Sequence, residues 1–128
     1  TQKLSPLLVF DVSLGIPQME AYVEEVRRRM TDTWPASNMV AFGHLGDGNI
    51  HLALTIGTTE STQVHAVETI IYEELAKNDG VISAEHGIGL DKREFLKHSR
   101  SSTEIRLMKT LKASLDPKNI LNPGKIFV

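Results

Sequence analysis

Hydrophobic and polar residues alternate from residue 7 to residue 14, and this pattern predicts a strand with one buried face. The hydrophobic spacing then lengthens to three or four residues, which predicts one helix starting near Pro17 and another over residues 62–77. A last helix is predicted after Ser101, because Ser101 and Glu104 have the spacing of a capping box. The predicted apolar stripes are Met19, Val23, Val26 and Met30; Val64, Val67, Ile71 and Leu75; and Ile105, Met108, Leu111 and Leu115.

Between the first two helices, residues 38–56 are predicted to form a β-hairpin with Asp47 and Gly48 as a two-residue turn. Counting outward from this turn places His44 directly opposite His51. Opposed residues have Cβ atoms about 5 Å apart, so the two imidazoles could bind one ion. The main apolar row of the hairpin falls on the other face.

A short strand is predicted over residues 81–83, just before Glu85 and His86. The complete order of strand, helix, strand, strand, helix, strand is that of a ferredoxin-like, split βαβ fold of the α+β class. Its antiparallel sheet would carry the helices on one face and expose the histidines on the other. We assign residues 1–100 to this ferredoxin-like domain and residues 101–128 to a C-terminal helix and tail.

Composition narrows the classes of partner. The chain has 128 residues, 41% hydrophobic residues and a net charge of −2, which is typical of an ordinary globular domain and gives no reason to expect nucleic-acid binding. It has no cysteine, so a metal would need nitrogen and oxygen ligands. We expect no transmembrane segment and a soluble, cytoplasmic location. The chain starts at Thr1 rather than at a methionine, so we interpret it as a processed product or a fragment.

Two histidines and one carboxylate form a ligand set that leaves coordination positions open, as catalytic metal sites do. Because neighbours in an extended strand point to opposite sides, we expect only one of Glu85 and His86 to bind the ion. We favour Glu85 as the ligand and His86 as a general base. Such a metal could bind a 2-hydroxy acid through two oxygens, and Lys92 could bind a carboxylate. Nothing in the chain accepts a hydride, so a cofactor is required.

Three alternatives stay open from the residues alone. The paired histidines could simply stack or hydrogen-bond to each other. Asp11 falls on the same side as the histidines, but we expect it to be a solvated edge carboxylate. The same three ligands would also suit a stand-alone metal hydrolase in which His86 activates water. A non-catalytic domain could instead form a homodimer through the sheet face that carries Val40 and Phe42.

Three motifs occur in one order: residues 43–51 (GHLGDGNIH), residues 83–89 (SAEHGIG) with Lys92, and residues 116–125 (DPKNILNPGK). In these motifs the chain resembles the C-terminal domain of FAD-linked oxidases of the vanillyl-alcohol oxidase type. The resemblance is strongest to the D-2-hydroxy-acid group, which includes D-lactate dehydrogenase, the glycolate oxidase FAD subunit and D-2-hydroxyglutarate dehydrogenase. It covers almost the whole chain and implies a ferredoxin-like cap over a flavin.

The resemblance also implies roles for single residues. His44, His51 and Glu85 would bind a divalent metal, usually zinc, and His86 would take the hydroxyl proton while a hydride passes to the flavin. FAD would be bound mainly by an N-terminal domain that these residues do not include, with Asn122 near it, and the isolated chain would be inactive. Our candidate substrate contacts are Lys92 and Asn49. Some relatives carry an asparagine where this chain has Ala53, so a polar substrate contact is not carried over to that position.

Overall fold

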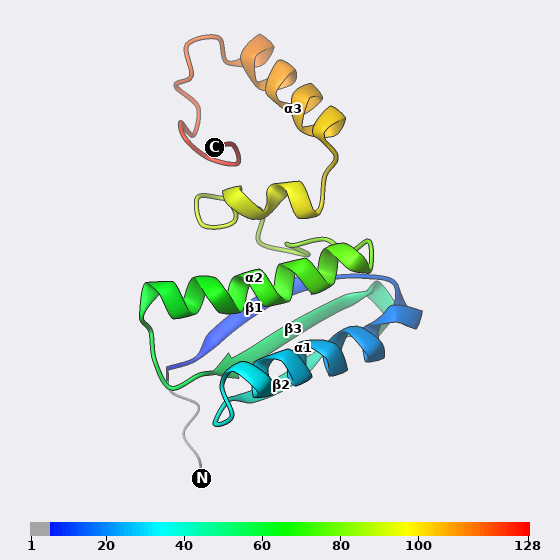
Figure 1. Ribbon diagram of the computed structural model, residues 1–128. Coiled ribbons are helices and arrows are strands. Elements are labelled where there is room, and N and C mark those ends of the chain that lie inside the picture. Colours follow the sequence, from blue (N-terminus) through cyan, green and yellow to red (C-terminus); the bar gives the residue numbers. More distant parts are fainter. Residues whose placement is uncertain (1–5) are drawn as a thin grey trace.

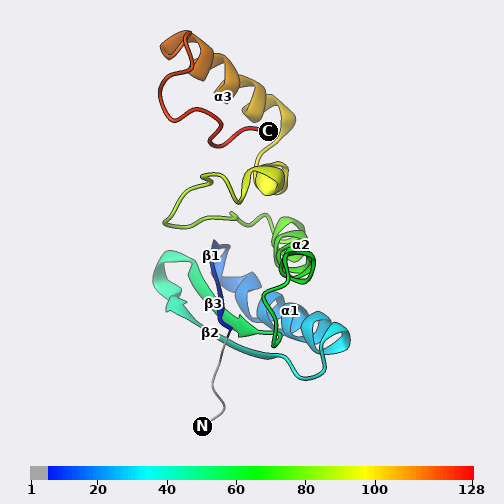
Figure 2. The ribbon, with the colours of Figure 1, turned by 90° about the vertical axis from the view of Figure 1, so that its left-hand side faces the viewer.

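The computed structural model describes residues 6–128 and shows an α+β domain with a C-terminal arm. Strands β1 (Leu8–Ser13), β2 (Asn38–His44) and β3 (Asn49–Thr55) form an antiparallel sheet in the order β1-β3-β2. Helices α1 (Met19–Thr33) and α2 (Ser61–Lys77) both cover the same face of this sheet (Figures 1 and 2). We call the other face the open face.

The predicted fourth strand is reduced to one bridge. Ser13 and Val81 each donate a backbone hydrogen bond to the other, at 3.0 and 2.7 Å, on the free edge of β1. This is the edge at which the fourth strand of a ferredoxin-like sheet would lie. The strand does not continue because the backbone N–H of Ile82 turns to the Ser99 hydroxyl, at 2.9 Å.

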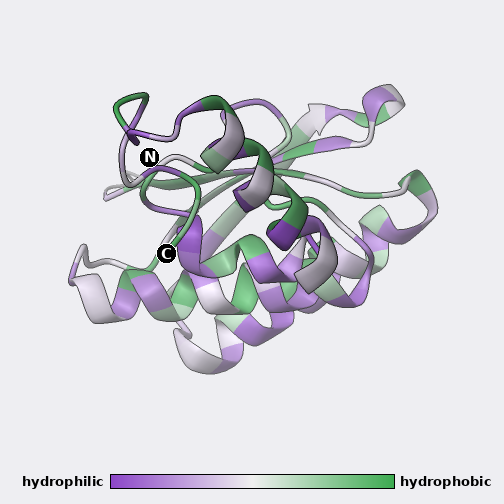
Figure 3. Ribbon diagram, turned by 90° about the horizontal axis from the view of Figure 1, so that it is seen from above, coloured by the Kyte–Doolittle hydropathy of each residue, from purple (hydrophilic) through white to green (hydrophobic). Residues whose placement is uncertain are grey.

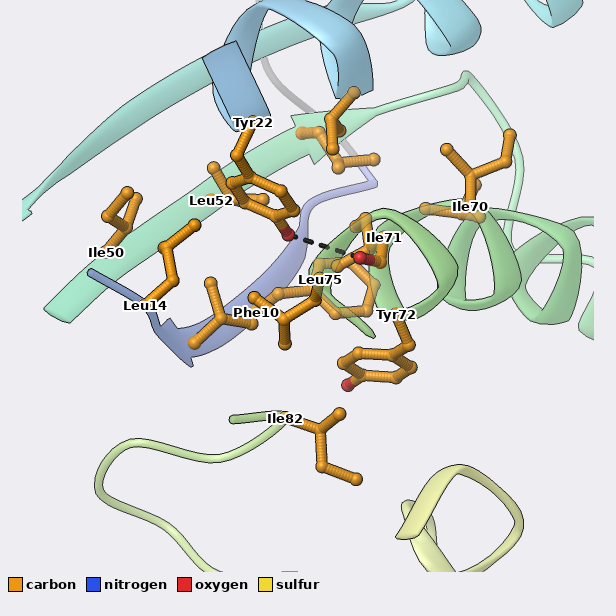
Figure 4. Packing of buried hydrophobic residues seen from close by; sticks show 14 of the residues in the cluster. Phe10, Leu14, Tyr22, Ile50, Leu52, Ile70, Ile71, Tyr72, Leu75 and Ile82 are labelled. Atoms are coloured by element: carbon orange, nitrogen blue, oxygen red, sulfur yellow. Dashed lines mark hydrogen bonds between the residues drawn. The ribbon is translucent and has the colours of Figure 1, made fainter. Parts of the chain in front are cut away.

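The core lies between the sheet and the two helices (Figure 4). Alternation along β1 buries Phe10 and Val12, as predicted. The predicted stripes of α1 and α2 are confirmed, since Met19, Val26, Met30, Val67, Ile71 and Leu75 are all buried. Tyr22 and Tyr72 extend this core, and the Tyr22 hydroxyl donates to the backbone oxygen of Ile71 at 3.3 Å.

The turn between β2 and β3 is longer than predicted. A short 3-10 helix, η2 (Leu45–Asp47), leads to Gly48, whose φ of 72° suits glycine. The register therefore moves by two residues, so Phe42, not His44, lies directly opposite His51. Because side chains alternate with a period of two, this shift leaves the paired residues of β2 and β3 on their predicted faces. Leu45, predicted on the apolar face, instead lies in η2 and is exposed.

The C-terminal arm comprises residues 101–128. The 3-10 helix η3 (Arg93–His98) leads to α3 (Ser102–Leu115), which stands away from the sheet (Figure 2). The predicted capping box is confirmed, because Ser101 and Glu104 bond reciprocally at the start of α3. Hydrophobic and hydrophilic residues alternate along the helices (Figure 3), but α3 buries no residue and Leu111 and Leu115 are exposed. None of the helices within residues 6–128 is both long and apolar enough to cross a membrane.

The packing predicts unequal effects for two leucine truncations. Leu52 is fully buried in β3, whereas Leu107 on α3 is 59% exposed. Leu52→Ala should lower the free energy of unfolding by about 2–5 kcal/mol through loss of burial and a residual cavity. Leu107→Ala should change it by less than about 0.5 kcal/mol. Urea denaturation of both variants measures the difference, and equal effects would contradict the placement of the core.

Candidate functional site

Three side chains from three strands form a row across the open face. Asp11 in β1 pairs with His51 in β3, and His51 pairs with Phe42 in β2. The rings of Phe42 and His51 have centroids 5.4 Å apart. Phe42 is exposed, but Asp11 is only 3% exposed, because the loop after Val81 crosses this end of the row. The site therefore lies where that loop meets the open face.

His44, His51 and Glu85 form the one group of potential metal ligands within the described residues. One nitrogen or oxygen atom from each lies within 4.8 Å of the others, and His51 Nε2 is 3.9 Å from Glu85 Oε1. The His44 and His51 rings are nearly perpendicular, with centroids 6.2 Å apart. Ligand atoms around a tetrahedral zinc lie about 3.3 Å apart, so binding requires only a small contraction of this group.

Asn49 orients the carboxylate of this group. Its side-chain amide donates to Glu85 Oε1 at 2.5 Å, across 36 positions of the sequence. Asn49 is buried beside the turn, whereas the Glu85 side chain is 47% exposed. A buried donor therefore fixes one oxygen of a carboxylate that is otherwise free to move.

His86 is not a member of this group and lines a pocket of about 330 Å³ between β1 and residues 86–92. Val9, Asp11 and Lys92 line the same pocket. The His86 ring is largely exposed, and its Nδ1 lies 3.8 Å from Asp11 Oδ2. Glu85 therefore belongs to the ligand group and His86 to the adjacent pocket, as we predicted. Our reason was wrong, however, because the two residues lie in a bent loop and not in an extended strand.

Lys92 is the cation of the pocket. It is partly buried just before η3, and its backbone N–H donates to Ile88 at 3.3 Å. Burial lowers the pKa of Lys92, and the negative charge of Asp11 opposes this shift. An ammonium that lacks full hydration has more to gain from an anion, so this side chain is suited to bind a carboxylate.

Asn122 belongs to neither the ligand group nor the pocket. It lies in the tail after α3, where its φ is 47°. Asp116 shapes this tail by accepting backbone hydrogen bonds from Ile120 and Leu121, at 3.0 and 2.9 Å. The hydrogen bond from Lys112 lowers the pKa of Asp116.

The end of the tail returns to the loop of the pocket. Ile126 donates its backbone N–H to Gly89 at 2.8 Å, and the Arg93 guanidinium donates to the Gly124 carbonyl at 2.8 Å. The tail motif and the Glu85–His86 motif therefore lie on connected segments, although the sequence separates them.

Asp11 is the site residue that sequence reasoning missed. We expected a solvated carboxylate, but Asp11 is buried and accepts backbone hydrogen bonds from Glu85 and His86. Its alternation with Phe10 and Val12 already placed it on the histidine face. The predicted ferredoxin-like sheet implies that β1 pairs with β3, but the register that puts Asp11 opposite His51 was not readable from the sequence.

Comparison with known proteins identifies the family of the chain. The family of FAD linked oxidases, C-terminal domain, matches residues 2–126, and the chain belongs to that family. The chain is 41% identical over 116 residues to the mitochondrial D-2-hydroxyglutarate dehydrogenase of Danio rerio. This match covers 91% of this chain and 21% of that protein.

Two further relatives show the same partial coverage. The D-2-hydroxyglutarate dehydrogenase of Stutzerimonas stutzeri is 38% identical over 122 residues, covering 91% of this chain and 26% of that protein. A putative mitochondrial D-lactate dehydrogenase of Schizosaccharomyces pombe is 38% identical over 124 residues, covering 91% of this chain and 24% of that protein. The chain thus spans about a fifth to a quarter of the length of these relatives.

The environment of Lys92 predicts how it titrates. The pKa of Lys92 should lie below the usual lysine value of about 10.4, because burial disfavours the charged form. The unfolded chain then binds more protons between the two pKa values, so stability rises with pH across that window. Asp91 raises the pKa of Lys92, so Asp91→Asn should lower the midpoint further. Side-chain NMR titration measures both, and a midpoint at or above the usual value would contradict this placement.

Proposed function

We propose that this chain is the substrate-facing C-terminal domain of a FAD-dependent dehydrogenase that oxidises a small D-2-hydroxy acid, of the glycolate, D-lactate or D-2-hydroxyglutarate type. The observation that carries the proposal is the juxtaposition of His44, His51 and Glu85 with the pocket that holds His86 and Lys92. The names of the relatives support the same reaction class.

The donor set fits a divalent metal, and zinc in particular. Two imidazoles and one carboxylate satisfy its preference for nitrogen and oxygen and leave a position for substrate. Asn49 supplies the outer hydrogen bond that ligating carboxylates usually have. A bound zinc would polarise the hydroxyl of the substrate and make its proton more acidic.

The residues of this chain supply the remaining steps except acceptance of the hydride. FAD, which is bound mainly by a separate N-terminal domain, accepts the hydride. His86 lies in the pocket, outside the ligand group, so its imidazole is free to take the hydroxyl proton. Lys92 binds a carboxylate of the acid from the same pocket. Asn49 is buried against Glu85, so its first role is to orient that ligand, and its direct contact with substrate stays a prediction.

The surface of the chain supports a second domain as its main partner. Leu107, Leu111 and Leu115 are exposed at four-residue spacing on α3, and Val40 and Phe42 are exposed on the open face. We assign the arm, residues 101–128, to contact with the flavin-binding domain, with Asn122 on its tail near the cofactor. The alternative partner is a second copy of this chain, bound through the open face. The cytoplasmic location stays a prediction, and the names of two relatives place those proteins in mitochondria.

Zinc binding can be tested on the 128-residue chain. If the three ligands bind zinc, a concentration of 100 times Kd should stabilise the chain by about 2.7 kcal/mol and raise its Tm by roughly 10 °C. His51→Ala should abolish the increase, whereas His65→Ala should retain it, because His65 lies on α2 outside the ligand group. Differential scanning fluorimetry measures this, and an unchanged Tm at saturating zinc would count against the site.

Proton abstraction can be tested in the full-length enzyme. His86→Gln should slow reduction of the flavin by D-lactate or D-2-hydroxyglutarate by roughly 10²–10⁴-fold, since it removes the base. The FAD and zinc contents should not change, because the His86 side chain is 70% exposed and outside the ligand group. Stopped-flow absorbance measures the rate, and His65→Gln is the matched control. A flavin reduction rate equal to that of the wild type would rule out His86 as the base.

A further inference from the structure

Asp11 is the central carboxylate of the site, although it belongs to none of the three motifs. Its side chain is 2% exposed, and its two oxygens have different surroundings. Oδ2 accepts hydrogen bonds from the backbone N–H groups of Glu85 and His86, at 2.7 and 3.3 Å. Oδ1 has no hydrogen-bond partner among the described residues.

Oδ2 of Asp11 anchors the loop where the Glu85 and His86 side chains diverge. Glu85 and His86 are adjacent, yet Glu85 joins the ligand group and His86 lines the pocket. Both backbone N–H groups point to the same oxygen of Asp11, so the direction of each side chain is set relative to β1. A further backbone hydrogen bond, from Ala84 to the Asp11 carbonyl at 3.4 Å, leads into this arrangement.

Oδ1 of Asp11 faces His51. Asp11 and His51 are directly paired across β1 and β3, and Oδ1 lies 3.9 Å from His51 Nδ1. A buried carboxylate oxygen without a donor is unfavourable, and His51 Nδ1 is a donor within reach of a small rotation of the ring. If Nδ1 carries the hydrogen, the lone pair of the neutral ring is on Nε2, the nitrogen that lies 3.9 Å from Glu85.

We propose that Asp11 is a positioning residue that selects the Nδ1–H tautomer of His51 and anchors the loop at Glu85 and His86. Oδ1 of Asp11 would orient His51, and Oδ2 would orient Glu85 and position His86, the proposed base. The arrangement is the carboxylate–histidine–metal pattern in which an outer carboxylate directs the ligating nitrogen. Its consequence for metal binding rests on the proposed function, but the tautomer itself does not.

Asp11→Asn separates the two roles. The amide oxygen can still accept the two backbone hydrogen bonds, so the loop and the fold should be retained. The amide nitrogen would instead present a donor to His51 Nδ1 and so favour the Nε2–H tautomer. Asp47→Asn is the matched control, because Asp47 is an exposed aspartate in the neighbouring turn η2.

The experiment is a two-bond ¹H–¹⁵N NMR correlation of the labelled 128-residue chain without metal, followed by zinc titration calorimetry. We expect the Nδ1–H form of His51 in the wild type and in Asp47→Asn, and the Nε2–H form in Asp11→Asn. The zinc affinity of Asp11→Asn should fall by about 10–100-fold, with that of Asp47→Asn unchanged.

Each outcome decides the proposal. An Nε2–H form of His51 in the wild type overturns it even if Asp11→Asn fails to fold, because that measurement needs no variant. An Nδ1–H form of His51 that is retained in a folded Asp11→Asn also overturns it, whereas wild-type zinc affinity in that variant overturns only its consequence for the metal. If the wild type binds no zinc but shows the Nδ1–H form, the metal role fails while the positioning role of Asp11 stands.

Discussion

The site depends on the attachment of one loop to the open face of a small sheet. A single buried carboxylate, Asp11, accepts two backbone hydrogen bonds from this loop at the point where Glu85 and His86 diverge. Such charge-assisted bonds are stronger than neutral ones, particularly where water is excluded. Without this attachment, Glu85 and His86 would lie on a bent segment joined to β1 by the bridge at Val81 and the hydrogen bond from Ala84 to the Asp11 carbonyl.

The fold makes the open face available for chemistry. Both helices pack on the other face, where Phe10, Val12 and the stripes of α1 and α2 form the core. Asp11 and His51 can therefore stand on a rigid sheet without interrupting the apolar packing. Placement on strands restricts the direction of each side chain, which suits the proposed metal-ligand group.

Much of the fold and the ligand group could be predicted from local patterns. Alternation fixed which residues of β1 face the core, helical spacing found α1 and α2, and the capping box found the start of α3. The predicted turn was wrong, because η2 adds two residues to it, but a shift of two keeps His44 and His51 on one face. The convergence of both with Glu85 was predicted from the motifs.

The remaining features depend on contacts between distant segments. The register of β1 against β3 decides that Asp11 meets His51, and no local pattern encodes this register. The fourth strand is short because Ile82 bonds to Ser99, a partner 17 positions away. The stripe predicted for α3 buries no residue in this domain, and its spacing does not say what it packs against.

The most direct measurement is an anomalous-scattering map from crystals of this chain grown with zinc. We expect one strong peak at about 2.0–2.2 Å from a nitrogen of His44, from Nε2 of His51 and from an oxygen of Glu85, with Asp11 hydrogen-bonded to Nδ1 of His51. A fully occupied zinc elsewhere, with these three side chains apart, would contradict it.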